Sequence, residues 1–139
     1  MTFLWVVNAL ALAFGAALGA RGLLDPKWAS RFVRLKADEQ GGGFAEFRAT
    51  YGGVFLMMHL AALVLTLRYL LAGGYLVGVV ATGAAAALAA GWAGASGGRI
   101  LSMLLDRTDT RFNRLSAGVE AAMALAIAGP WIGWYFSAA

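Results

Sequence analysis

The sequence predicts an all-α integral membrane protein, a four-helix up-and-down bundle with a short interfacial amphipathic helix in its first cytoplasmic loop. Three observations lead to this prediction. The chain has 139 residues, 61% of them hydrophobic and only 13% charged, which is too apolar for a soluble domain of this size. Its apolar residues form four segments, each close to the ~20 residues that cross ~30 Å of hydrocarbon; the segments are 3–20, 49–67, 75–98 and 115–136. Its basic residues are distributed very unevenly between the connecting loops.

The distribution of Lys and Arg predicts the orientation of the chain. Of the 11 basic residues, only Arg68 falls on the side that holds the two chain ends. The opposite side holds the rest, which are Arg21, Lys27, Arg31, Arg34, Lys36, Arg48, Arg99, Arg107, Arg111 and Arg114. Cytoplasmic loops are rich in Lys and Arg because short basic loops are poorly translocated. We therefore expect the basic side to face the cytoplasm and both termini to face outward.

The four spans are expected to form one transmembrane domain over residues 1–139. With the polar ends of the helices included, we place the spans at about 3–24, 45–71, 75–104 and 111–136. The pI of about 10.0 is interpreted as a basic rim facing anionic headgroups, because the chain has no nucleic-acid-binding motif. The absence of cysteine excludes structural disulfides and thiolate-ligated iron–sulfur clusters.

The first span is interpreted as a retained helix and not as a cleaved signal peptide, because its basic residue follows the apolar segment instead of preceding it. Asn8, Gly15 and Gly19 lie on one face of this helix. The two glycines form a GxxxG pattern, which lets two helix backbones approach closely in a membrane. We favour packing inside the bundle over a dimer interface for this face.

An amphipathic helix is expected in the loop that follows, at about residues 26–38. Asp25 suits its N-cap and Pro26 its first turn. Its aromatic and basic residues recur at helical spacing, and those singled out are Trp28, Arg31, Phe32 and Arg34. Such a helix lies at the membrane interface. A role in anchoring the loop is favoured over recognition of an anionic lipid or a protein partner.

The second span has the most polar face. One stripe carries Arg48, Gly52, Phe55, His59, Ala62 and Thr66. His59 follows Arg48 by eleven residues, about 16 Å along the helix axis, and is therefore expected near mid-membrane, as is Asn8 of the first span. The favoured interpretation is a neutral, hydrogen-bonded histidine. A proton relay or metal ligand is the alternative, although the chain has no second histidine.

The third span follows a tight Gly73-Gly74 turn and is very rich in small residues. One stripe carries Gly83, Ala87, Gly91, Gly94 and Gly98. We expect this stripe to make a close helix–helix contact, with the Gly15 and Gly19 face of the first span as its internal partner. If that partner is absent, a helix from another protein is expected to fill the groove.

The fourth span is expected to be capped near Asp109 or Asn113 and bent at Pro130. Aromatic residues gather near the outer ends of the spans and predict an interfacial belt; they are Trp5, Tyr69, Tyr75, Trp131, Trp134 and Tyr135.

A polar cluster is predicted near the inner leaflet. Arg48, Arg99 and Glu120 fall at similar depth, and Tyr51 and Ser102 are close to them in sequence. An unpaired charge at this depth costs at least ~2.5 kcal/mol, so we expect Glu120 to pair with Arg99, Arg48 or both. A structural ionic clasp is favoured over an anion- or headgroup-binding pocket.

These residues also carry a resemblance. The run Arg48-Ala-Thr-Tyr51-Gly52-Gly53, the later run Gly98-Arg99-Ile-Leu-Ser102, and Glu120 resemble an uncharacterised family of small four-span bacterial membrane proteins, a domain of unknown function. The resemblance covers most of spans two to four. It implies a bacterial inner-membrane location but no reaction.

No catalytic or metal-binding signature is present in the sequence, so neither enzyme activity nor a cofactor is expected. The favoured function is an accessory subunit or scaffold that packs against partner transmembrane helices or lipids, with no nucleic-acid partner. A small transporter or lipid-handling protein that uses the Arg/Glu pocket is the alternative. Nearby arginines disfavour the proton-coupled glutamate that such a transporter needs.

Overall fold

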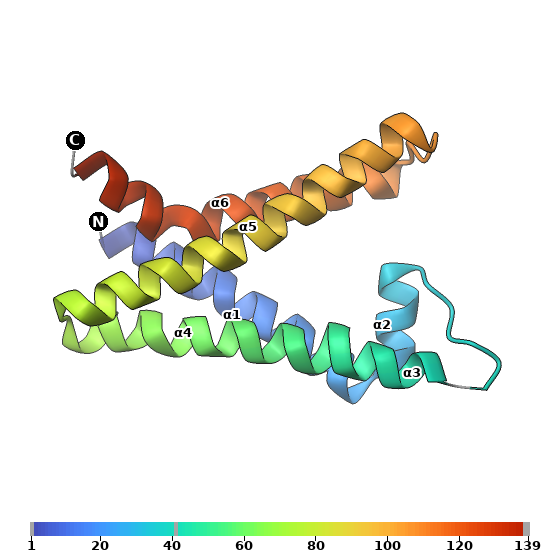
Figure 1. Ribbon diagram of the computed structural model, residues 1–139, viewed down its shortest axis with the longest axis horizontal. Helices are drawn as coiled ribbons and strands as arrows, with labels where there is room; N and C mark the ends of the chain where they lie inside the picture. The colour runs from blue at the N-terminus through green and yellow to red at the C-terminus, as the bar shows by residue number, and fades with distance from the viewer. Residues whose placement is uncertain (1, 41, 138–139) are drawn as a thin grey trace. The chain divides into compact units, whose positions relative to one another are not determined.

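The computed structural model describes residues 2–40 and 42–137, so the two chain ends, whose side of the membrane was predicted above, lie outside the described residues. The described residues are all-helical and contain no strand. In chain order the elements are α1 (Thr2–Leu24), α2 (Pro26–Val33), α3 (Gly42–Glu46), the π-helix η1 (Phe47–Val54), α4 (Phe55–Ala72), α5 (Tyr75–Leu105) and α6 (Arg111–Ser137) (Figure 1).

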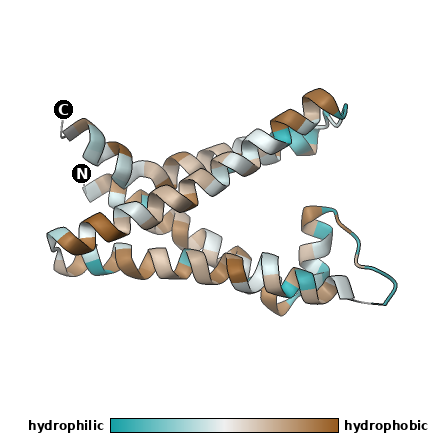
Figure 2. Cartoon of the chain, in the orientation of Figure 1, coloured by the Kyte–Doolittle hydropathy of each residue, from teal (hydrophilic) through white to brown (hydrophobic). Residues whose placement is uncertain are grey.

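Four helical segments are long and apolar enough to cross a membrane, which confirms the predicted number of spans. They are Thr2–Leu24, Gly42–Ala72, Tyr75–Leu105 and Arg111–Phe136, and the second combines α3, η1 and α4. Hydrophilic residues concentrate in and after α2 and in the α5–α6 turn, whereas the helices between them are largely apolar (Figure 2). The chain therefore has the make-up of a multi-pass membrane protein.

The chain divides into two compact units, which we describe separately. Residues 1–11 and 65–139 form one, here called the α5–α6 unit, and residues 12–64 form the other, here called the α2 unit. The helices α1 and α4 each contribute one part to each unit.

In the α5–α6 unit, α5 and α6 run side by side (Figure 1). Small residues on α5, including Ala81 and Ala85, are fully buried. The buried Ser96 hydroxyl donates a hydrogen bond to the Ala117 carbonyl of α6 across 2.9 Å. The turn into α5 uses Gly73 (φ 67°) and Gly74 (φ 98°), a left-handed conformation that glycine adopts without steric cost.

In the α2 unit, α1 packs closely against η1 and α4 through glycines. A Cβ atom added to Gly19 would lie 2.5 Å from the backbone nitrogen of Leu56, and one added to Gly52 would lie 2.6 Å from the Leu23 backbone. Gly15 faces the ring of His59. The prediction that Gly15 and Gly19 serve helix packing is consistent with this contact, and the helix that packs against them within the α2 unit is α4, where the α5 stripe was expected.

The π-helix η1 was not predicted from the sequence. It contains the whole Arg48-to-Gly53 run that carries the family resemblance. Glycine has a weak preference for the α-helix, and Gly52 and Gly53 are adjacent here. The close approach of the Leu23 backbone to Gly52 adds a tertiary constraint. π-Helical turns are rare and often occur at functional sites.

Helix α2 is shorter than the predicted range of 26–38. As expected, the Asp25 carboxylate caps its N-terminus by accepting a hydrogen bond from the Trp28 backbone N–H across 2.9 Å. The helix ends because Arg34 is left-handed (φ 61°, ψ 29°). The Leu35 N–H then bonds to the Ser30 carbonyl (3.1 Å) and the Arg34 N–H to that of Arg31 (3.3 Å), which is a Schellman motif with arginine in place of the usual glycine.

Two further details of α1 and α6 differ from expectation. The N-cap of α6 is Thr110, whose hydroxyl accepts a hydrogen bond from the Asn113 N–H across 3.2 Å; it is neither Asp109 nor Asn113. Trp5 is only 5% exposed because its ring packs on that of Tyr69, with centroids 4.3 Å apart. Trp5 is therefore a core residue and not a lipid-facing member of an aromatic belt.

Candidate functional site

The clearest polar site is an ion pair between α5 and α6. The Arg99 Nη2 atom lies 2.6 Å from Glu120 Oε1, and Arg99 Nε lies 3.0 Å from Glu120 Oε2. This side-on, bidentate geometry is the strong form of an Arg–carboxylate contact. The Glu120 side chain is 12% exposed and that of Arg99 33%, so the pair is shielded mainly on the carboxylate side.

The ion pair continues into a network at the α5–α6 turn. Arg99 Nη1 donates to Asn113 Oδ1 across 3.5 Å, and Asn113 Nδ2 donates to the Thr108 carbonyl across 2.7 Å. The hydroxyls of Ser102 and Thr108 are 3.0 Å apart. The network therefore connects the last turns of α5, the turn itself and the start of α6. Such an arrangement stabilises the pairing of the two helices and neutralises both charges.

Two members of the predicted inner-leaflet cluster, Arg48 and Tyr51, belong to the α2 unit. The Arg48 guanidinium donates to the Leu23 carbonyl in the last turn of α1. This carbonyl is one of the four that a helix C-terminus leaves without an intrahelical partner, and a cation there is also favoured by the helix dipole. Arg48 thus caps α1. Tyr51 is partly exposed and packs on the Phe47 ring, with centroids 5.6 Å apart.

His59 is buried, with 1% of its surface exposed. Its Nδ1 atom lies 2.7 Å from the Phe55 carbonyl on the preceding turn, and its ring packs against Phe55 at a centroid distance of 4.3 Å. The other edge of the ring faces Gly15. The geometry is that of a histidine that fills the space above a glycine in a helix–helix contact.

Asn8 and Thr66 form a second buried polar site, in the α5–α6 unit. Both are 0% exposed. The Thr66 hydroxyl donates to Asn8 Oδ1 across 2.9 Å, and Asn8 Nδ2 donates to the Ile127 carbonyl across 2.7 Å. Ile127 lies three residues before Pro130, which has no N–H and interrupts the hydrogen bonding of α6. The carbonyl that Pro130 leaves without a helical donor is that of Ala126, four residues earlier, so the Asn8 bond is made to the carbonyl that follows it. Through these bonds Asn8 and Thr66 join α1, α4 and α6 close to Pro130.

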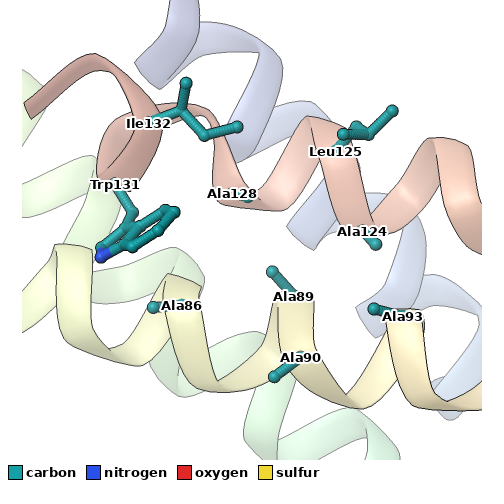
Figure 3. A pocket seen from close by; sticks show the side chains of 9 residues that line it. All are labelled: Ala86, Ala89, Ala90, Ala93, Ala124, Leu125, Ala128, Trp131 and Ile132. Carbon is teal, nitrogen blue, oxygen red and sulfur yellow. The ribbon is translucent and has the colours of Figure 1, made fainter. Parts of the chain in front are cut away.

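The small-residue face of α5 is open within its own unit. No described atom of the α5–α6 unit lies within 4 Å of a Cβ added to any of its glycines at 83, 91, 94, 97 and 98. Beside this face is a groove of about 410 Å³. It lies between α5 and α6 and is lined mostly by alanines, with Trp131 and Ile132 at one end (Figure 3).

The described residues contain no group of three or more His, Cys, Asp or Glu side chains that could hold a metal ion. Comparisons with protein-family models, with curated proteins and with solved structures find no match to this chain.

From the sequence, Asn113 was predicted only as a possible helix cap, and neither Thr108 nor the pairing of Thr66 with Asn8 was predicted. A signal for Asn113 exists, because it precedes Glu120 by seven residues and therefore lies on the same helical face. Thr108 contributes its backbone carbonyl as well as its hydroxyl, and that contribution depends on the conformation of the turn. The Asn8–Thr66 contact depends on the register between α1 and α4, which neither helix specifies alone.

Proposed function

We propose that this chain is a non-catalytic membrane subunit or scaffold whose α5 helix packs against a transmembrane helix of a partner protein. The observation that supports this most is the set of open glycines at 83, 91, 94, 97 and 98. A surface without side chains allows two helix backbones to approach closely and gain dispersion contacts, whereas flexible lipid chains fill it less well. The alanine-lined groove beside it enlarges the same surface.

The alternative, a transporter or lipid-handling protein that uses the Arg/Glu pocket, has less support. The Arg99 guanidinium and the Glu120 carboxylate already satisfy each other in a bidentate contact. A ligand anion would have to displace that carboxylate from its partner, at the cost of leaving an acidic group in the membrane without its cation. The pair therefore fits a structural clasp better than an unoccupied binding site.

The partner-helix proposal predicts a specific effect of Gly91→Leu combined with Gly94→Leu. A Cβ atom added at either position has no neighbour within 4 Å in its own unit, and leucine is a better helix former than glycine. The isolated protein should therefore keep its stability, while the complex in the native membrane should be lost. Size separation of gently solubilised membranes, followed by detection of the chain, measures this directly.

A control is Ala13→Leu with Ala17→Leu, which also adds two leucines within about one helical turn, at exposed positions of α1. This variant should keep the native size of the complex. A Gly91/Gly94 variant that retains both its stability and its native size would mean that the α5 stripe faces lipid, and the partner-helix proposal would be abandoned.

We further propose that the four spans form an up-and-down bundle in a bacterial inner membrane, with the basic ends cytoplasmic and both termini periplasmic. The ten-to-one distribution of Lys and Arg supports this orientation. Alkaline phosphatase fused after the last residue should accordingly be active, because the enzyme requires export. A fusion within the turn at residues 106–110 should be inactive. The reverse pattern of activities would overturn the orientation.

A further inference from the structure

We propose that α2 and the turn after it form a binding surface for the headgroups of anionic phospholipids. This headgroup surface consists of Arg21, Lys27, Arg31, Arg34 and Lys36 together with the aromatic rings of Trp28 and Phe32. It goes beyond the proposed packing of α5, because it uses a different element in the other unit. Either proposal can therefore fail without the other.

The headgroup surface carries more positive charge than the other basic turn, although both turns carry enough to orient the chain in a membrane. Residues 21–36 contain five basic residues and one acidic residue, and the whole chain has a net charge of +4. The other basic turn, residues 106–114, contains three basic and two acidic residues, and its Arg114 pairs with Asp109 at 3.4 Å. Both turns meet the positive-inside rule. Residues 21–36 have an excess of four positive charges, which Asp38 and Glu39 directly after them reduce to two, and residues 106–114 have an excess of one.

The single acidic residue of this stretch is already engaged. Asp25 accepts the hydrogen bond from the Trp28 backbone N–H and so caps α2. Its negative charge lies at the N-terminal end of the helix, where the helix dipole favours it. The later cations, Arg31, Arg34 and Lys36, are exposed and lie at or beyond the other end.

The apolar part of the surface is suited to the membrane interface. The Arg21 guanidinium lies 4.5 Å from the centre of the Trp28 ring in a cation–π contact, and Trp28 stacks on Phe32 at a centroid distance of 4.9 Å. Phe32 is nevertheless 52% exposed. An exposed aromatic group next to cations is the pattern of helices that insert apolar side chains among headgroups while their cations contact the phosphates.

The surface is held in place by the rest of its unit. Pro26 and Ala29 are buried, and α2 packs against η1 and α3. The Schellman turn then brings Leu35 back beside Ser30 through two hydrogen bonds. Because the helix is anchored on one side, its cations are arranged before a lipid binds, which lowers the entropic cost of binding.

Arg34 ends α2 in the left-handed position of the Schellman turn (φ 61°), where glycine is the usual residue. Arg107 in the α5–α6 turn is also left-handed (φ 54°), so this conformation does not distinguish the two basic turns. What the Schellman turn contributes is the position of the Arg34 cation, at the end of α2.

The test uses the full-length protein in detergent and counts bound lipids by native mass spectrometry. Phosphatidylglycerol and phosphatidylcholine of the same chain length are titrated separately. The variant Lys27→Gln/Arg31→Gln/Arg34→Gly should bind phosphatidylglycerol more weakly, by roughly fivefold for each cation removed. Binding of the zwitterionic phosphatidylcholine should not change. Phe32→Ser should also weaken phosphatidylglycerol binding, although it leaves the charge unaltered.

The matched control is Arg107→Gln/Arg111→Gln/Arg114→Gln, which removes the same charge from the other basic turn. An equal loss of phosphatidylglycerol binding in this control, or no loss in the α2 variant, would overturn the proposal. Inorganic phosphate at millimolar concentration should not displace the lipid; if it does, the site recognises free phosphate instead of a lipid. Arg34→Gly alone separates folding from binding, because it should keep the thermal stability and still reduce phosphatidylglycerol binding.

Discussion

Replacing Gly19 by alanine is expected to lower the free energy of unfolding by about 3 kcal/mol, at the upper end of the range for overpacked cores. The added methyl group would lie 2.5 Å from the Leu56 nitrogen and 2.7 Å from its Cα atom. Because both atoms belong to the backbone of α4, a rotamer change cannot remove the clash, and the two helices must separate. Unfolding of the purified protein in mixed detergent, followed by circular dichroism, measures the loss.

The control for this prediction is the same substitution on the open face of α5. A Cβ atom added to Gly94 has no described neighbour within 4 Å in its unit. Gly94→Ala should therefore leave the stability unchanged or raise it by up to about 1 kcal/mol, since alanine is the better helix former. Equal stabilities for the two variants would show that α1 and α4 do not approach as closely as described.

Replacing Glu120 by alanine is expected to destabilise the protein by about 2 kcal/mol. Removal of one partner from a fully buried ion pair costs 3–5 kcal/mol, and the 33% exposure of the Arg99 side chain lowers that figure through solvent screening. Arg99→Gln should have a similar effect. The double variant should recover part of the loss, because no unpaired charge remains. The coupling energy from the four proteins measures the clasp.

The exposed pair of Arg114 and Asp109 offers a control within the same turn. Its side chains are 64% and 57% exposed, and such surface pairs contribute about 0–1 kcal/mol. Asp109→Ala should therefore have little effect on stability. A Glu120→Ala protein as stable as the Asp109→Ala protein, with no coupling to Arg99, would mean that the Arg99–Glu120 pair does not hold α5 and α6 together.

The clasp and the Asn8 site share one physical role. Each joins helices through polar groups that are costly to bury without a partner. Each site therefore makes the observed register of its helices more favourable than a shifted one. Asn8 does this at a carbonyl beside Pro130. Arg99 and Glu120 do it near the α5–α6 turn.

The sequence by itself determined the features that depend on composition and local spacing. The four spans follow from the lengths of the apolar segments, because the thickness of the hydrocarbon layer sets that length. The start of α2 follows from Asp25 and Pro26, since capping is a local interaction. The Arg99–Glu120 pair could also be anticipated, because a charge inside a membrane requires a partner and few partners were available at that depth.

The tertiary structure alone decided the features that depend on register between helices. Gly19 packs against Leu56 of α4, where the α5 stripe was expected, because several helices carry small residues and the sequence gives no preference among them. The π-helical conformation of residues 47–54 was likewise not predicted, and in the structure the Leu23 backbone of α1 lies against Gly52 of this segment. By its expected depth in the membrane, Arg48 was as suitable a partner for Glu120 as Arg99 was. In the structure its guanidinium instead donates to the Leu23 carbonyl at the end of α1. Depth and helical face can be calculated from one helix, whereas the partner of a side chain is set by the free energy of packing two helices together.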